Sequence, residues 1–223
     1  MEKYRLTDET IDFCDVTLYR IEALRDFGPI KAGDKGGFVQ SYHNLSQEGD
    51  CWIHGEAKVF GNAKVYENAQ VFGRAEVFCY AFVKGNASVF GNAKVFDDAK
   101  VYGNASVFGN AFVFDDAKVY GNASVICDAA VCNKAEVFGV ARVYGNAFVK
   151  GDAIIETDRD YIVFKNWWSS GRYFIWTRSN NMWNVGCFYG TGKELIKKAY
   201  ADSEDSGKEY ERVVRYVESI LAD

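Results

Sequence analysis

Apolar and polar positions follow a six-residue period through the middle of the chain. From Gly49 to Glu156 the hexad Gly-Asn-Ala-x-Val-aromatic repeats without an insertion, which makes eighteen hexads. The third position is Ala from residue 57 to residue 153, and the fifth is Val from residue 59 to residue 149. A period held this strictly predicts a solenoid.

The hexad also predicts short strands joined by tight corners. Positions three and five are two apart, so in a strand they face the same side, while positions four and six face the other. Gly, Asn and Asp at positions one and two tolerate the positive φ of a corner. Three hexads then close a triangular coil, and six coils stacked about 4.8 Å apart make a prism roughly 29 Å long, lined by Ala and Val. A helix is excluded, because a 3.6-residue period would scatter these residues around its circumference.

The sequence outside the repeat divides the chain into three parts. These are an N-terminal cap at 1–48, the β-helix at 49–156 and a C-terminal α+β domain at 157–223. Open solenoid ends expose unpaired strand edges, so we expect residues 1–48 to cover one end.

The C-terminal part is expected to fold as three strands followed by two helices. Strand-like runs cover 161–165, 172–178 and 182–189, with turn residues between them. Thr191-Gly-Lys-Glu194 and Ser206-Gly-Lys-Glu209 match the capping-box pattern and predict where the two helices begin. The predicted fold class is mainly β, a parallel β-helix of about six eighteen-residue coils followed by a small βββαα domain.

The repeat resembles the hexapeptide-repeat, left-handed β-helix family. Members carry an aliphatic residue followed four positions later by a small one, as in Val59–Ala63 and Val89–Ala93. The resemblance covers about half of the chain and implies a left-handed coil and a homotrimer. The segment 19–47, with Lys31-Ala-Gly-Asp-Lys-Gly-Gly-Phe38, also resembles the lead-in of hexapeptide proteins of phages and prophages.

Residues eighteen positions apart stack, so the outward positions sort into three faces. The first face is aromatic, the second is apolar in its C-terminal half, and the third combines Tyr with Lys and suits water. The residues expected at an oligomer interface are Phe72, Phe90, Phe108 and Ile126 on the first face and Phe112, Phe114 and Phe148 on the second. An apolar patch this long exceeds what monomers tolerate, so we predict a closed homo-oligomer, a trimer by the resemblance. The alternative is that the stacked rings merely shield one another.

Composition limits the kinds of partner that the chain can bind and the cellular compartment in which we expect it. The net charge of −5 disfavours nonspecific binding to DNA. The six cysteines show no paired spacing, which is typical of free thiols in a reducing cytoplasm. Residues 1–20 are mixed polar and charged, so neither a signal peptide nor a membrane span is expected.

A candidate ligand site lies in the C-terminal part. Between Tyr161 and Gly190 there are ten aromatic residues, three basic residues and no acidic one. Arginine beside flat rings suits an anionic planar ligand such as a nucleotide, because the guanidinium forks onto phosphate while the rings stack on a base. The residues proposed for this site are Arg172, Trp176, Arg178, Phe174, Trp167, Trp168, Trp183 and Lys165. The alternative is that the aromatic residues form the core of a small domain, with the arginines at its rim.

Catalysis has little support in the sequence. The resemblance suggests a CoA-dependent acyltransferase, whose chemistry needs a histidine base, but the chain has only His43 and His54. We find no Ser/His/Asp set, no phosphate loop and no metal-ligand spacing, and we predict no cofactor and no metal. The favoured hypothesis is a non-enzymatic binding protein, phage-encoded, that sequesters a nucleotide signal in counter-defence. The alternatives are an acyltransferase and a scaffold or host-protein-binding module.

Overall fold

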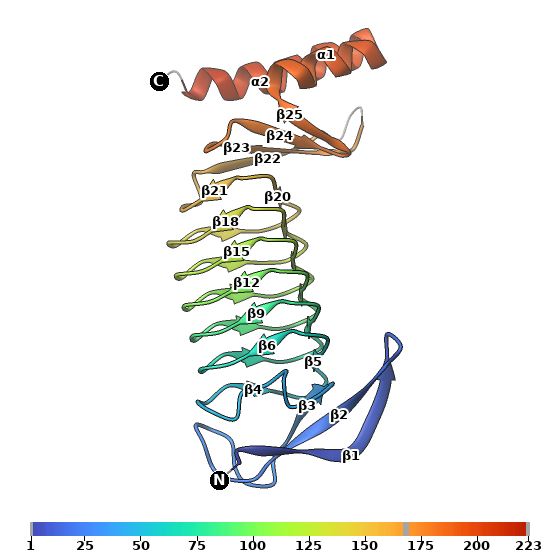
Figure 1. The fold of residues 1–223 in the computed structure, drawn as a ribbon. Coiled ribbons are helices and arrows are strands. Elements are labelled where there is room, and N and C mark those ends of the chain that lie inside the picture. Colours follow the sequence, from blue (N-terminus) through green and yellow to red (C-terminus); the bar gives the residue numbers. More distant parts are fainter. Residues whose placement is uncertain (1, 167–169, 222–223) are drawn as a thin grey trace. The chain divides into compact units, whose positions relative to one another are not determined.

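The computed structural model describes residues 2–166 and 170–221, in two compact units (Figure 1). The first unit is Met1–Asp158 and the second is Arg159–Asp223. The first contains the solenoid and the second contains a small sheet and two helices.

The first unit is a left-handed-type parallel β-solenoid of about seven coils, which confirms the predicted fold class. Two-residue strands stack in register eighteen positions apart, as in the pairing of Ser88 with Ser106. The first face is formed by β4 (Trp52–Ile53), β7 (Gln70–Val71), β10 (Ser88–Val89), β13 (Ser106–Val107), β16 (Ser124–Val125) and β19 (Arg142–Val143). The second is formed by β5 (Lys58–Val59), β8 (Glu76–Val77), β11 (Lys94–Val95), β14 (Phe112–Val113), β17 (Ala130–Val131) and β20 (Phe148–Val149). The third is formed by β6 (Lys64–Val65), β9 (Phe82–Val83), β12 (Lys100–Val101), β15 (Lys118–Val119), β18 (Glu136–Val137) and β21 (Ile154–Ile155).

The bore of the solenoid is filled as the hexad predicts. The Ala at position three and the Val at position five of every hexad, such as Ala105 and Val107, are buried. Side-chain amides form a second ladder along one corner, where Asn86 accepts a hydrogen bond from Asn68 and donates one to Asn104, each over 3.1 Å. The corners are therefore tied from coil to coil by side chains as well as by the backbone.

One further coil precedes the six that the hexad predicts over 49–156, which gives about seven in all. Strand β3 (Lys35–Val39) pairs in parallel with β5, and Leu45 forms a bridge with Val65. Phe38 pairs with Lys58, twenty positions on, whereas later partners are eighteen apart. Because this coil is longer and lacks the Ala-x-Val signature, the six-residue pattern does not reveal it.

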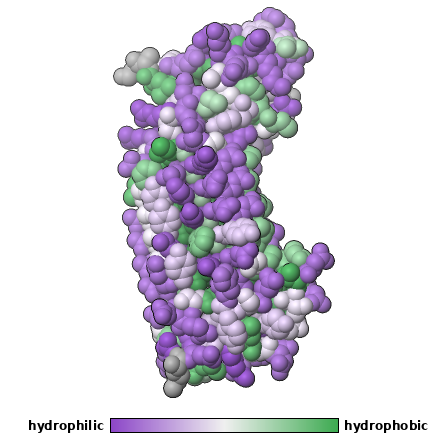
Figure 2. All heavy atoms as spheres, in the orientation of Figure 1, coloured by the Kyte–Doolittle hydropathy of each residue, from purple (hydrophilic) through white to green (hydrophobic). Residues whose placement is uncertain are grey.

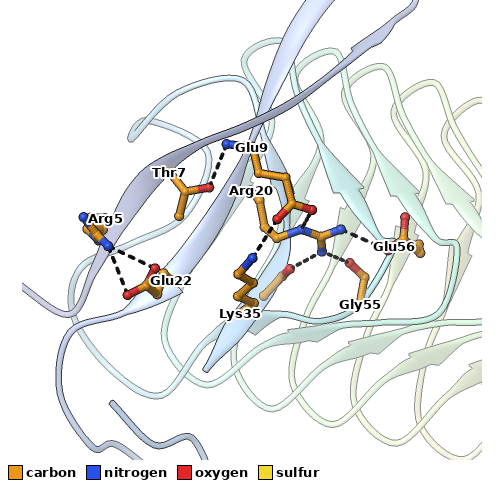
Figure 3. A network of polar contacts seen from close by, with 9 residues as sticks. Arg5, Thr7, Glu9, Arg20, Glu22, Lys35, Gly55 and Glu56 are labelled. Carbon is orange, nitrogen blue, oxygen red and sulfur yellow. Dashed lines mark hydrogen bonds and ion pairs between the residues drawn. The ribbon is translucent and has the colours of Figure 1, made fainter. Parts of the chain in front are cut away.

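An antiparallel hairpin is attached to this first coil. It consists of β1 (Tyr4–Phe13) and β2 (Val16–Ala23), and β2 pairs with β3. Arg20 anchors the hairpin to the coils: its guanidinium donates to the Gly36 carbonyl over 2.8 Å and to the Gly55 carbonyl over 3.1 Å, and it pairs with Glu9 and Glu56 (Figure 3). The guanidinium also lies over the ring of Phe38, 4.1 Å from its centroid.

The second unit has four antiparallel strands, one more than predicted. They are β22 (Tyr161–Lys165), β23 (Tyr173–Thr177), β24 (Met182–Val185) and β25 (Phe188–Thr191), paired in chain order. The third predicted run, 182–189, is split by a turn at Gly186, whose φ is +57°. The apolar pattern continues on both sides of this turn, so the sequence does not reveal it.

Two helices follow, α1 (Gly192–Asp202) and α2 (Glu204–Leu221). The capping box at Thr191 and Glu194 is confirmed. The second predicted box is wrong, because Ser206 lies inside α2, and its backbone N–H donates to the hydroxyl of Ser203 over 3.1 Å. Neither helix within the described residues has the length and apolar character needed to cross a bilayer.

Candidate functional site

The outer faces of the solenoid carry parallel ladders of aromatic rings. On the first face Phe90 stacks on Phe72 and on Phe108, with 4.6 Å between ring centroids in each pair. On the second face the stack runs through Phe60, Phe78, Phe96 and Phe114 at 4.9–5.1 Å. These rings are half-buried, because each covers the faces of its neighbours. The stacked rings therefore shield one another in part and remain partly exposed.

The remaining predicted interface residues lie toward the C-terminal end of the same two faces. Ile126 continues the column of the first face and is half-buried. Phe112 is 37% exposed, and Phe148 lies tilted at 6.4 Å from Phe114. The structure thus keeps the predicted apolar residues on the outside of the coils.

The third face has a different character, because a lysine interrupts its ladder. Tyr120 stacks on Tyr102 at 4.9 Å and on Phe138 at 5.0 Å. One coil before Tyr102 the aromatic position is taken by Lys84, whose Nζ lies 5.8 Å from the ring centroids of both Tyr66 and Tyr102. The missing ring leaves an opening between two tyrosines.

That opening belongs to a hollow of about 530 Å³. It is lined by Tyr66, Phe82, Lys84, Lys100, Tyr102 and Lys118. Figure 2 shows hydrophilic and hydrophobic residues interleaved over the side of the solenoid that faces the viewer. Three lysines among three aromatic rings suit this hollow to an anionic ligand.

Hydrogen bonds tune the charges at one end of the hollow. Glu136 accepts from Lys118 Nζ over 2.8 Å and from the Tyr120 hydroxyl over 2.9 Å. These bonds lower the pKa of Glu136, and the bond to Glu136 raises the pKa of Lys118. Burial raises the pKa of Tyr120 to about 12, with the Glu136 bond as a second cause. The positive charge of Lys118 is therefore balanced by Glu136. In contrast, neither Lys84 nor Lys100 forms an ion pair with a described carboxylate.

Both histidines lie in the N-terminal half of the solenoid. His54 Nε2 meets Oε1 of Gln70 at 2.7 Å, and the ring packs edge-on against Phe72. His43 is exposed and lines a second hollow of about 410 Å³, which shares Tyr66 and Phe82 with the first. In the described part of the chain neither imidazole forms a hydrogen bond with a carboxylate, a hydroxyl or a thiol.

In the C-terminal unit, three of the rings proposed for ligand stacking form its core. Phe174, Trp176 and Trp183 are at most 2% exposed and pack with residues of both helices, including Leu195 and Tyr210. The indole N–H of Trp176 is satisfied by Asn181 Oδ1 at 2.8 Å. These three rings are closed to a ligand, which agrees with the alternative that they build the domain.

The basic residues of the proposed site remain at the surface. Arg172 and Arg178 are exposed and flank β23 at its opposite ends, and Lys165 is exposed at the end of β22. At about 3.3 Å per residue the two arginine backbones are roughly 20 Å apart, so they mark two positions rather than one paired clamp. Trp167 and Trp168 lie outside the described residues.

The hollow on the third face was not predicted, although the sequence contains its signal. In the column Tyr66, Lys84, Tyr102, Tyr120, Phe138, the lysine is the one non-aromatic residue. The sequence alone indicates only that this combination of Tyr with Lys suits water. The structure adds that Phe82 and Lys100 on neighbouring strands line the same opening.

The comparisons with known proteins give one short similarity. No protein-family model matches the chain. An uncharacterized acetyltransferase of Escherichia coli (strain K12), YdcK, is 39% identical over 62 residues, which cover 24% of this chain. The match spans 19% of the length of that relative. A solenoid of eighteen-residue coils together with this partial similarity fits a β-helix of the hexapeptide-repeat type.

Proposed function

We propose that this chain is a non-enzymatic, self-associating binding protein. Its solenoids would assemble as a homotrimer through the first face and the C-terminal half of the second. The aromatic ladders carry this proposal, because Phe72, Phe90 and Phe108 form a flat stack whose edges still face outward. Packing these edges against sister chains would remove apolar area from water at about 25 cal/mol per Å².

Light scattering on the purified chain tests the assembly. We expect a mass three times that of the 25.0 kDa chain at micromolar concentration. The double variant Phe90→Glu plus Phe108→Glu places two carboxylates on the first face and should give a monomer that keeps its circular dichroism. The control is Tyr80→Glu, at a corner position that is 56% exposed, and it should leave the mass unchanged. A monomeric parent chain would contradict the proposal.

An acyltransferase is the second candidate. The partial similarity to an uncharacterized acetyltransferase favours it, together with His43 at the edge of a hollow that adjoins the basic one. If it were correct, His43 would act as the general base and His43→Asn would abolish turnover of acetyl-CoA. Absence of acetyl-CoA turnover with a panel of amine and hydroxyl acceptors would exclude this candidate.

A narrower version of the binding function is a sponge for a nucleotide signal, encoded by a phage and active in a reducing cytoplasm. Exposed Arg172, Arg178 and Lys165 are the residues that such a ligand could still reach in the C-terminal unit. Calorimetry with cyclic dinucleotides and ADP-ribose derivatives tests it, with Arg172→Ala plus Arg178→Ala as the loss-of-binding variant. If the double variant released as much binding heat as the parent chain, any nucleotide site would have to lie elsewhere.

A further inference from the structure

The interrupted ladder on the third face is a specific geometric opening. Coils are stacked about 4.8 Å apart, so Tyr66 and Tyr102, two coils apart, hold their rings roughly 9.6 Å from each other. Every directly stacked pair elsewhere on the solenoid has its centroids 4.6–5.1 Å apart. The opening therefore has the height of one missing ring.

We propose that this opening binds a flat aromatic ring that carries one anionic group. Lys84 Nζ, 5.8 Å from both ring centroids, occupies part of this opening, so its flexible side chain has to swing outward first. A ring then placed midway between Tyr66 and Tyr102 would lie about 4.8 Å from each, inside the range that stacked aromatic pairs adopt. Phe82 packs edge-on against Tyr66, with 6.4 Å between centroids at 87°, and adds a third aromatic wall. The bound ring would complete the column that continues through Tyr120.

The charged side chains at the opening determine which net charge a ligand can carry there. Once Lys84 has swung outward, its ammonium and that of the exposed Lys100, which lines the same hollow, can meet an anion at the edge of the ring. Lys118 contributes little, because it pairs with Glu136 at 2.8 Å. The corner residues Asp97 and Asp98 precede Lys100 in the same hexad and would repel a highly charged ligand. A carboxylate or a single phosphate fits this balance.

This inference rests on the proposed role as a binding protein, but it does not depend on the assembly. The proposed trimer uses the first and second faces and leaves the third face open. The oligomer can therefore fail in light scattering while the ligand site stands, and the converse also holds. The two tests are run on the same preparations to separate these outcomes.

The test is calorimetry of the full chain with three probes. 2-Naphthoate presents a flat ring with a carboxylate, AMP presents a flat ring with a phosphate, and cyclohexanecarboxylate presents the charge without a flat ring. We expect one site per chain for naphthoate, for AMP or for both, and which of them binds identifies the anionic group. Cyclohexanecarboxylate should bind at least tenfold more weakly. Equal binding of all three, or no binding of either aromatic probe at millimolar concentration, would overturn the proposal.

Variants locate the site. Lys84→Tyr supplies the missing ring, so it should preserve the fold, fill the opening and weaken the aromatic probe at least tenfold. Lys100→Ala should weaken it about fivefold by removing one charge-assisted contact. The matched control is Lys94→Ala on the second face, which removes a lysine paired with Glu76 and should leave the affinity unchanged. Undiminished binding by a folded Lys84→Tyr protein would place the probe elsewhere and refute the assignment.

Discussion

At the scale of single residues, the sequence predicts side-chain direction well and side-chain partners poorly. The period of six places the Ala of position three and the Val of position five in the bore, and each of these is buried. The same period says nothing of Lys3, which is fully buried and donates from Nζ to the carbonyl and the thiol of Cys51 at 3.0 and 3.2 Å. These partners are 48 residues apart in the chain, so no local pattern connects them.

The contacts of Glu136 give a stability that depends on pH. Hydrogen bonds from Lys118 and Tyr120 hold the folded pKa of Glu136 below its ordinary value of 4.5. The unfolded chain therefore takes up the proton first as pH falls. The contribution of Glu136 is complete above about pH 4.5 and is lost as pH falls through the folded pKa.

Urea unfolding at several pH values measures this contribution. The gap in unfolding free energy between the parent chain and Glu136→Gln should be constant near neutral pH and shrink below pH 4.5. Glu48→Gln is the control, because it removes an exposed carboxylate that forms no side-chain hydrogen bond among the described contacts. A gap that stays constant down to pH 3 would contradict the assigned cause.

At the scale of elements, the sequence predicts the regularly repeated strands but not the places where the repeat is interrupted. The short strands of the coils lie where the hexad places them, whereas the first coil escaped detection because it is two residues longer. The extra residues fall between Leu45 and Ile53, where Gly49 has a φ of +66°. In the C-terminal unit the split of one apolar run into β24 and β25 escaped detection for a related reason, since both strands continue one pattern.

Alanine substitutions at Gly49 and Gly55 distinguish the cost of backbone strain from the cost of steric crowding at the corners. Both have positive φ, +66° and +59°, so alanine at either costs about 1–2 kcal/mol. A Cβ at Gly49 would lie only 2.2 Å from the carbonyl oxygen of Glu67, while nothing lies within 4 Å of one at Gly55. We expect Gly49→Ala to cost a further 1–3 kcal/mol, roughly, from overpacking. Thermal unfolding of both variants measures the difference, and equal losses would show that the coil relaxes around the new methyl group.

Ser203 is the residue that caps the start of α2. Its hydroxyl accepts the backbone N–H of Ser206, three positions on. Ser203→Ala should therefore destabilise the C-terminal unit by about 1 kcal/mol, a typical cost of losing an N-cap. Ser206→Ala makes the same chemical change inside the helix and should cost little. A larger loss for Ser206→Ala would restore the capping box that the sequence predicted.

At the scale of the whole molecule, the chain combines two kinds of cooperativity. The solenoid is stabilised by contacts between adjacent coils, which is typical of nearly one-dimensional repeat proteins. The C-terminal unit has a compact core that joins Phe174 and Trp183 of the sheet to Leu195 and Val214 of the helices. Sequence composition separates these regions, but it does not distinguish a core of tryptophans from a tryptophan-lined site. The same residue types can form a core or line a binding site, so only the burial of the tryptophans in the structure distinguishes the two.

This division predicts that the two units lose their protection separately. Phe174→Ala empties part of the C-terminal core and should cost about 3–5 kcal/mol. Hydrogen exchange followed by mass spectrometry should then show faster exchange within residues 173–217 and unchanged exchange in the coils around Val107. Val107→Ala is the reciprocal variant, because Val107 is fully buried in the bore, and its effect should spread to adjacent coils while the C-terminal unit keeps its protection. If either variant accelerated exchange equally in both units, the molecule would unfold as one body and the two-unit description would fail.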